Sequence, residues 1–312
     1  MSIIVVTFYK FILLADVADL QHKLIQIGQA QAIRGTILLA PEGINGTIAG
    51  SPQAIDAALN WLRSDDRFTD LEYKQSQAQT WPFDRLKVRI KPEIVTLGLP
   101  EVNPAEQVGT YVSPKEWNQL NTDPEVLVID TRNQYEVEIG SFQGAINPKT
   151  RSFRQFPDYV RDQLDPSRHQ KVALFCTGGI RCEKASSFLL SQGFQQVYHL
   201  KGGILKYLED TAPEASLWQG ECFVFDQRVA LQQGLEEGSS ALCRGCGHPI
   251  SPSDQADPAY QEGICCPYCV DQLTEEKRAR QQERQRQYLQ KTGSISPVVS
   301  SLESSRPRSG AG

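Results

Sequence analysis

Cys176 is the residue whose surroundings most clearly predict chemistry. It directly follows the apolar run KVALF. After it come the loop residues Thr177, Gly178, Gly179, Ile180 and Arg181, and then a segment with helical spacing. Glycines allow backbone N–H groups to turn toward the sulfur, and both the start of a helix and an arginine supply positive charge. These surroundings lower the pKa of a thiol. The pattern therefore predicts an anionic sulfur at Cys176, as a thiolate or a persulfide.

The length of this loop separates two kinds of chemistry. Four residues lie between Cys176 and Arg181, whereas the loops of tyrosine and dual-specificity phosphatases carry one residue more and cradle a phosphate. The tighter loop suits a single sulfur atom. An inert buried thiol is the alternative interpretation, because free cysteine often behaves as a small core residue.

Three further residues are expected beside the loop. Asp130 and Arg132 close the neighbouring apolar strand, where they either support the reaction or form a structural ion pair that holds the loops. Cys182 lies in the helix that follows Cys176. It is either a resolving thiol, able to form a disulfide with Cys176, or a helix residue packed against the sheet.

A second group of cysteines predicts a metal site. The segments CRGCGHP and CCPYC supply two CxxC pairs, Cys243, Cys246, Cys266 and Cys269. Four thiolates at this spacing close a tetrahedral zinc site, which would be structural because no position stays open. Cys265 and His248 are alternative ligands, and a loop of free thiols that has lost its metal is the alternative interpretation.

The first 91 residues predict a ferredoxin-like, split βαβ unit of the α+β class. Its expected order is strand, helix, strand, strand, helix and strand, in the ranges 3–9, 16–28, 35–50 for both middle strands, 52–63 and 86–90. Ser51 and Pro52 mark the start of the second helix, because serine caps helices and proline is tolerated in the first turn. The Pro-rich stretch 92–112 is expected to be a linker.

Residues 113–220 predict an α/β unit that places Cys176 at a strand end. Apolar strands alternate with helices, as expected for a doubly wound parallel sheet covered on both faces. Ligands bind such sheets outside the carboxyl ends of the strands. The remaining chain is expected to form a small cysteine-rich segment at 221–274, then a charged helix and a disordered tail over 275–312.

Composition narrows the functional classes. The 312 residues are 40% hydrophobic and carry a net charge of −5, which is typical of a globular protein and does not announce nucleic-acid binding. No apolar run approaches the roughly 20 residues of a membrane span, and the opening segment lacks the features of a signal peptide. The clustered cysteines favour the reducing cytoplasm.

Local basic segments are candidates for RNA contact. Lys149, Arg151 and Arg154 stand among aromatic residues, a composition that suits base stacking and neutralisation of phosphates. The segments 85–91 and 277–291 are further candidates, although the first also fits an ordinary strand and the second a solvated charged helix.

Several motifs together give a resemblance to one family. The segment VLVIDTRNQYEVEIGSFQGAINP, followed by the Cys176 loop, resembles a rhodanese domain. With GTILLAPEGINGTIAG, YHLKGGILKYLE and the late CPYC, the chain over about residues 1–275 resembles the rhodanese-like tRNA uridine hydroxylases. The resemblance implies conversion of the wobble uridine of tRNA to 5-hydroxyuridine, with molecular oxygen as co-substrate. It also implies that Cys176 is the cysteine that forms a persulfide.

Without the resemblance, the residues do not predict a hydroxylation reaction. There is no two-histidine-one-carboxylate pattern and no flavin or nicotinamide motif, so the electron donor is not identified. Two alternatives stay open: a sulfurtransferase that moves sulfane sulfur through a Cys176 persulfide, and a non-enzymatic RNA-binding module. The N-terminal unit and the late cysteines favour the hydroxylase over a simple sulfurtransferase. The intact Cys176 argues against the non-enzymatic module.

Overall fold

The computed structural model describes residues 3–292 in two compact units, one ending at Ala241 and the other beginning at Leu242. Residues 221–241, which we expected in the cysteine-rich segment, therefore lie in the first unit. The stretch 293–312, with its predicted disordered tail, is outside the described residues. Among the helices described, none is both long and apolar enough to cross a membrane.

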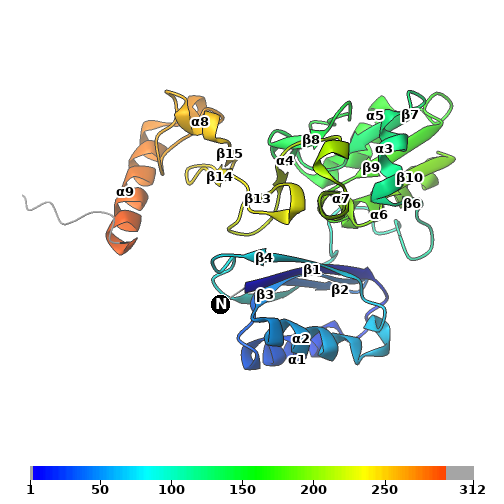
Figure 1. The fold of residues 1–312 in the computed structure, drawn as a ribbon, viewed down its shortest axis with the longest axis horizontal. Coiled ribbons are helices and arrows are strands. Elements are labelled where there is room, and N and C mark those ends of the chain that lie inside the picture. The colour runs from blue at the N-terminus through cyan, green and yellow to red at the C-terminus, as the bar shows by residue number, and fades with distance from the viewer. Residues whose placement is uncertain (1–2, 293–312) are drawn as a thin grey trace, which may run out of the picture. The chain divides into compact units, whose positions relative to one another are not determined.

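The N-terminal part of the first unit is a five-stranded sheet with two helices, shown in blue in Figure 1. Its elements are β1 (Ile3–Phe11), α1 (Val17–Ala30), β2 (Arg34–Ala40), β3 (Gly43–Gly50), α2 (Pro52–Arg63), a short 3₁₀ turn η1 (Asp66–Phe68), β4 (Tyr73–Ala78) and β5 (Leu86–Ile90). The strand order is β4-β1-β3-β2-β5. The first four strands have the split βαβ connectivity, so the ferredoxin-like expectation is confirmed.

The last strand of the motif differs from the one expected. We assigned it to 86–90, but that segment is β5, a fifth strand parallel to β2. The fourth strand of the motif is β4, which pairs antiparallel with β1 and brings Lys74 opposite Thr7. Its sequence, YKQSQA, has no apolar alternation to reveal it. Ala78 is its one buried side chain, so this edge strand contributes too little apolar surface to stand out in the sequence.

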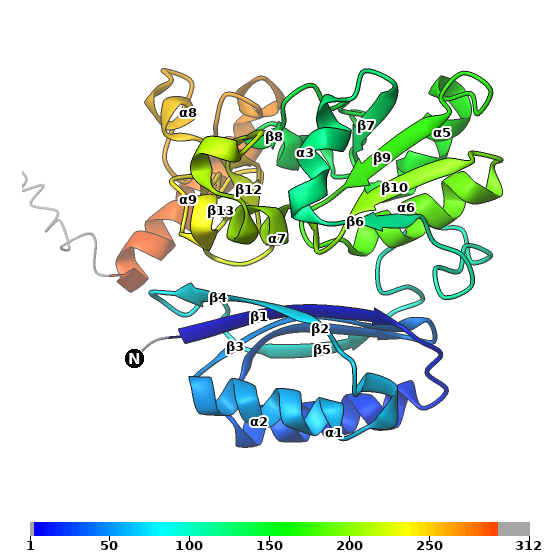
Figure 2. The ribbon, with the colours of Figure 1, turned by 45° about the vertical axis from the view of Figure 1, so that its right-hand side comes forward.

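The two faces of this sheet have different surroundings. Val6 and Phe8 of β1 pack in the core that α1 and α2 cover, and Ser51 caps α2 by accepting a hydrogen bond from Ala54 N, as predicted. Side chains alternate along a strand, so Thr7 and Tyr9 point to the opposite face. That face carries no helix of the N-terminal part (Figure 2).

The second part of the first unit is built on a four-stranded parallel sheet in the order β6-β10-β9-β7. The strands are β6 (Thr110–Val112), β7 (Val126–Asp130), β9 (Lys171–Phe175) and β10 (Gln196–Leu200). The helices are α3 (Pro114–Thr122), α4 (Gln134–Val137), α5 (Phe156–Gln163), α6 (Ile180–Ser191) and α7 (Gly203–Asp210). Separate hydrophobic cores lie on the two faces of the sheet, so the doubly wound expectation is confirmed.

Residues 92–112 do not behave as a free linker. Leu97 and Val102 are buried in the same core as α5 and α6, and β6 at the end of this stretch joins the parallel sheet. The stretch therefore belongs to the packed structure that surrounds the Cys176 loop.

Short elements complete the first unit. They are β8 (Gly140–Phe142), which pairs with β11 (Trp218–Gly220), the hairpin of β12 (Cys222–Phe223) and β13 (Ala230–Leu231), and three 3₁₀ turns, η2 (Phe153–Gln155), η3 (Pro213–Ala215) and η4 (Gln233–Leu235). Cys222 and Leu231 are buried in the core that also contains Phe175. The hairpin is therefore an integral part of this unit.

The second unit is small. It contains the strand pair β14 (Ala241–Leu242) and β15 (Pro249–Ile250), the helix α8 (Pro252–Ala256), the 3₁₀ turn η5 (Val270–Gln272) and the charged helix α9 (Glu275–Thr292), which is the helix that the sequence predicted. Arg278 of α9 donates a hydrogen bond to Gln261, and Gln281 donates one to the carbonyl of Gly245. One face of α9 thus packs on the cysteine-rich loops.

Candidate active site

Cys176 directly follows β9 and is fully buried. Gly179 donates its backbone N–H to the Cys176 sulfur at 3.1 Å, and it has a φ of 103° at the start of α6. The start of α7 holds the same loop from the other side, because Ile204 N and Leu205 N bind the carbonyls of Cys176 and Thr177. The predicted loop is therefore fixed between two helix starts.

These surroundings favour the anionic form of Cys176. Burial by itself raises the pKa of the thiol, but a hydrogen bond from the Cys182 thiol, the charge of Arg181 and the backbone N–H groups of both residues outweigh it. Together they lower the pKa of Cys176 to about 5. The pKa of Cys182 moves in the opposite direction, because of its burial and its hydrogen bond with Cys176. Cys182 consequently keeps its proton and donates a hydrogen bond to the Cys176 anion.

Other buried thiols lack this arrangement. Burial raises the pKa of Cys222 to about 12, and the nearby charge of Arg132 only partly offsets it. Cys222 is as buried as Cys176 but follows no glycine loop at a helix start. The comparison shows that the loop, and not burial, produces the anion.

Arg181 is held by a buried carboxylate. Its two terminal nitrogens donate to the two oxygens of Glu136 at 2.6 and 2.8 Å, and one of them also reaches Thr177 Oγ1 at 3.3 Å. Such a bidentate pair fixes the plane of the guanidinium. Glu136, on α4, therefore positions the charge that faces the Cys176 loop.

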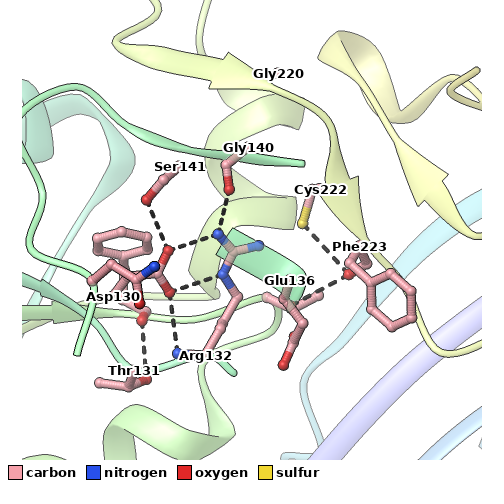
Figure 3. A network of polar contacts seen from close by, with 12 residues as sticks. Asp130, Thr131, Arg132, Glu136, Gly140, Ser141, Gly220, Cys222 and Phe223 are labelled. Carbon is pink, nitrogen blue, oxygen red and sulfur yellow. Dashed lines mark hydrogen bonds and ion pairs between the residues drawn. The ribbon is translucent and has the colours of Figure 1, made fainter. Parts of the chain in front are cut away.

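Asp130 and Arg132 form a network of polar contacts with Gly140 and Ser141 (Figure 3). Both side chains are fully buried, and Arg132 donates to both Asp130 oxygens at 2.9 and 2.6 Å and to the Gly140 carbonyl at 2.6 Å. Ser141 Oγ donates to the same carboxylate at 2.8 Å. This network joins the end of β7 to β8, which is the geometry of a structural ion pair.

The N-terminal sheet reaches the loop through a buried carboxylate. Tyr9 on β1 and Tyr111 on β6 each donate their hydroxyl to one oxygen of Glu183, at 2.8 Å. Burial raises the pKa of Glu183, and the two hydroxyl donors only partly oppose that effect. Tyr9 also approaches Gly179 so closely that a Cβ there would lie 2.8 Å from its hydroxyl. Only glycine fits at this contact.

Lys184, the next residue of α6, makes a second link between this helix and the N-terminal sheet. Lys184 is almost completely buried and forms ion pairs with Glu42, in the β2–β3 turn, at 2.8 Å and with Glu93 at 2.6 Å. Glu93 in turn accepts the backbone N–H groups of Leu97 and Gly98. The first turn of α6 therefore ties the N-terminal sheet to the Cys176 loop.

A cavity of about 650 Å³ lies between this sheet and the loop. Cys176, Thr177, Gly178, Ile180 and Arg181 line it from the loop. Thr7, Tyr9, Asn45, Thr47, Lys74 and Ser76 line it from the helix-free face of the sheet, and Phe225 lines it from the β12–β13 hairpin. This volume falls within the roughly 300–1,000 Å³ of small-molecule sites, so the cavity has room for one nucleotide.

The cavity contains only some of the basic residues that the sequence suggested. Arg154 lines it, whereas Lys149 and Arg151 are exposed and outside its lining. Lys74 and Lys91 also line it. In the part of the chain that the structure describes, no carboxylate forms an ion pair with Lys74, Lys91 or Arg154. Three basic side chains without a carboxylate ion pair thus line the cavity, and burial lowers the pKa of Lys74 among them.

The late cysteines come together as predicted. The sulfur atoms of Cys243, Cys246, Cys266 and Cys269 all lie within 4.8 Å of one another. The Cys246–Cys266 and Cys266–Cys269 sulfur distances are 3.7 and 3.8 Å, close to the roughly 3.8 Å expected around a tetrahedral ion with Zn–S bonds of about 2.3 Å. These four residues fit a metal ion. The Cys265 sulfur instead contacts the Ala259 carbonyl.

The sequence did not single out Tyr9, Lys74, Glu183 or Phe225. The alternation in β1 offered one signal, because a tyrosine stands on the face opposite Val6 and Phe8. A second signal was the adjacent charged residues Glu183 and Lys184, because they stand in a helix that was expected to pack on a sheet. Lys74 and Phe225 had none, since each reaches the cavity from a segment whose position depends on tertiary packing.

Comparisons with known proteins agree with this architecture. A model of the UPF0176 acylphosphatase like domain matches residues 3–94, and a model of the rhodanese-like domain matches residues 113–210. A tRNA uridine(34) hydroxylase from Picosynechococcus sp. is 58% identical over 277 residues, which are 89% of this chain and 93% of that protein. One from Teredinibacter turnerae is 54% identical over 284 residues, 91% of this chain and 88% of that protein.

The hydrogen bond from Cys182 gives a first prediction. Cys182→Ala should raise the pKa of Cys176 by about one to two units, because a hydrogen bond to a charged group is worth ~1.5–3 kcal/mol and one unit corresponds to ~1.4 kcal/mol. Cys182→Ser should keep the pKa low, since its hydroxyl also donates. The measurement is the ultraviolet absorbance of the thiolate against pH, as the difference from the matching Cys176→Ser protein. An unchanged midpoint in Cys182→Ala would contradict this role.

Proposed function

Because the chain belongs to the tRNA uridine(34) hydroxylase family, we propose that it hydroxylates the wobble uridine of tRNA to 5-hydroxyuridine, with Cys176 as the reacting sulfur. The observation that carries this proposal is the similarity to two proteins of that name along about nine-tenths of the chain. The anionic sulfur at the floor of a nucleotide-sized cavity supports the role of Cys176.

The size of the cavity suits one base removed from its stack. Enzymes that react with a base usually extrude it into a fitted pocket. A cavity of about 650 Å³ accepts a single nucleotide but not an anticodon loop. The rest of the loop would then lie outside, against the surface around the opening.

The reaction sets requirements beyond the cavity. The C5–H bond of the uracil becomes C5–OH; with molecular oxygen as co-substrate, the second oxygen atom leaves as water. That balance consumes two electrons and two protons from a donor. A thiolate or persulfide at Cys176 can serve as a nucleophile or contribute electrons, and the loop N–H groups and Arg181 would stabilise its negative charge.

A sulfurtransferase reaction is the second candidate for the same sulfur. The cavity favours the hydroxylase, because all of β1, β2, β3 and β4 of the N-terminal sheet contribute to its lining, which transfer of one sulfur atom does not need. We also place the reaction in the reducing cytoplasm, supported by eight free cysteines.

We assign the RNA contacts to the basic residues around the cavity. Arg154 lines it directly, and Lys149 and Arg151 lie in the same short segment. Their charges would neutralise phosphates next to the extruded nucleotide. Lys74 of β4 and Lys91, which directly follows β5, line the cavity from the other side.

The four-cysteine cluster would hold a structural zinc ion. Cys243, Cys246, Cys266 and Cys269 provide a complete thiolate set, which leaves no open position for substrate. The ion would fix the loops on which α9 packs. The role of the zinc ion would therefore be to stabilise the fold of the second unit, and it would take no part in the hydroxylation.

Replacing Cys176 tests the catalytic assignment. Cys176→Ser should form no 5-hydroxyuridine, because a serine hydroxyl is not ionised at neutral pH and cannot carry sulfur. Cys222→Ser is the matched control, since Cys222 is equally buried but has a raised pKa, and it should retain activity. The readout is nucleoside mass spectrometry of tRNA treated with each protein. Wild-type product levels from Cys176→Ser would remove this residue from the mechanism.

The cations around the cavity give a prediction about binding. Arg154→Gln should weaken tRNA binding and reduce the slope of log affinity against log salt by about 0.7, the value for one phosphate contact on a single strand. Arg168→Gln, an exposed arginine outside the cavity, should change neither. Filter binding over a range of salt concentrations measures both. An unchanged slope in Arg154→Gln would place the phosphate contacts elsewhere.

Metal analysis tests the cysteine cluster. Protein purified without chelator should carry about one zinc ion per chain, as expected for four thiolates in one site. The Cys243→Ser, Cys246→Ser double variant should lose the ion. Cys265→Ser should keep it, because that sulfur lies outside the cluster. Wild-type protein without zinc would count against the site.

A further inference from the structure

Phe225 is an exposed aromatic ring in a segment whose other apolar side chains are buried. Its side chain is 63% exposed, whereas Phe223, Val224 and Val229 are between 5% and 6% exposed. Phe225 also lines the cavity that contains Cys176. A large apolar surface left open to water inside a binding cavity marks a contact site for a ligand.

The ring is held at a defined place. Phe225 stands in the tip of the β12–β13 hairpin, where Val224 N donates to the Val229 carbonyl at 2.9 Å. Its ring packs edge-on against Phe223, with centroids 5.1 Å apart and planes at 88°. The edge-on contact fixes the Phe225 ring against Phe223 without stacking the two rings on each other.

The hairpin tip is anchored on both sides of the cavity. Arg228 is buried in an ion pair with Asp226 at 2.7 Å and donates to Ser76 Oγ of β4, also at 2.7 Å. Thr177 Oγ1 of the Cys176 loop donates to the Phe223 carbonyl at 3.4 Å. Phe225 is therefore fixed relative to both the N-terminal sheet and the reacting sulfur.

The surrounding charges indicate which apolar ligand the ring accepts. The Arg181 guanidinium carbon lies 5.9 Å from the centre of the Phe225 ring, and the basic residues Lys74, Lys91 and Arg154 line the same cavity. A purely apolar ligand gains nothing from these cations. A nucleotide uses both, because its base stacks on an aromatic face while cations neutralise its phosphates.

We propose that Phe225 is the stacking platform for the pyrimidine base that enters the cavity. This inference rests on the proposed function for the identity of the base, the wobble uridine. Stacking on a ring fixed between the Cys176 loop and β4 positions the base beside the sulfur. Phe225 is thus a residue that binds and orients the substrate, and it takes no part in bond formation.

The test uses two forms of an anticodon stem-loop, one with uridine at the wobble position and one with an abasic residue there. Phe225→Ala should bind the uridine form about 5- to 150-fold more weakly, the range that corresponds to ~1–3 kcal/mol of stacking per base. It should bind the abasic form as the wild type does. Phe225→Trp should restore binding, and Phe225→Leu, which keeps apolar bulk without a ring, should not.

Controls separate this result from other effects. Leu13→Ala, an exposed apolar residue outside the cavity, should bind both forms normally. The thiolate titration of Cys176 should be unchanged in all Phe225 variants, which shows an intact loop. Phe225→Ala that binds the uridine form as tightly as wild type would overturn the proposal. An equal loss on both forms would also overturn it, because the effect would not involve the base.

The binding measurement does not depend on hydroxylation. If the wild type binds the two stem-loops as expected but produces no 5-hydroxyuridine with oxygen and a reductant, the proposed function fails while the base platform stands. If the wild type hydroxylates and Phe225→Ala has the same KM and kcat, the platform fails while the proposed function stands.

Discussion

A negative charge buried at Cys176 is the constraint on which the rest of the site depends. An anion without access to water is costly unless donors and cations surround it. The Gly179 N–H, the Cys182 thiol and Arg181 supply that compensation. Arg181 is itself a buried charge, which explains the fully buried carboxylate of Glu136 beside it. Each charge near the sulfur is thus balanced by the next.

The same constraint explains the polar first turn of α6. In a helix that lies between the parallel sheet and the N-terminal sheet, Glu183 and Lys184 are expensive to bury unless each has partners. The N-terminal sheet and the turns beside it provide those partners through Tyr9, Glu42 and Glu93. The N-terminal sheet is therefore part of the active site. Its helix-free face closes the cavity, and its side chains and turns pair with the buried charges of α6, the helix that begins at the reacting loop.

The second unit solves a different physical problem. It is short and contains few large apolar residues, and a chain of this kind seldom builds a sufficient core by itself. Four thiolates that converge within one coordination sphere offer a replacement for that core. The packing of α9 on these loops through Gln281 and Arg278 depends on the loops keeping their shape.

The sequence by itself determined the features that depend on local pattern. The Ser51 cap, the glycine loop after KVALF and the spacing of the CxxC pairs are local, and all appear in the structure as expected. It also narrowed the roles of Asp130 and Arg132 to two, without choosing between them.

Only the tertiary structure decided which residues meet at the cavity. Lys74 lies on a polar edge strand that pairing with β1 creates, and Phe225 lies on a hairpin tip that Arg228 and Thr177 hold in place. Among three neighbouring basic residues, packing brought Arg154 to the cavity and left Lys149 and Arg151 outside its lining. Such contacts join segments distant in the chain, and no local periodicity records them, because the energy that selects them comes from burial and charge pairing in the folded state.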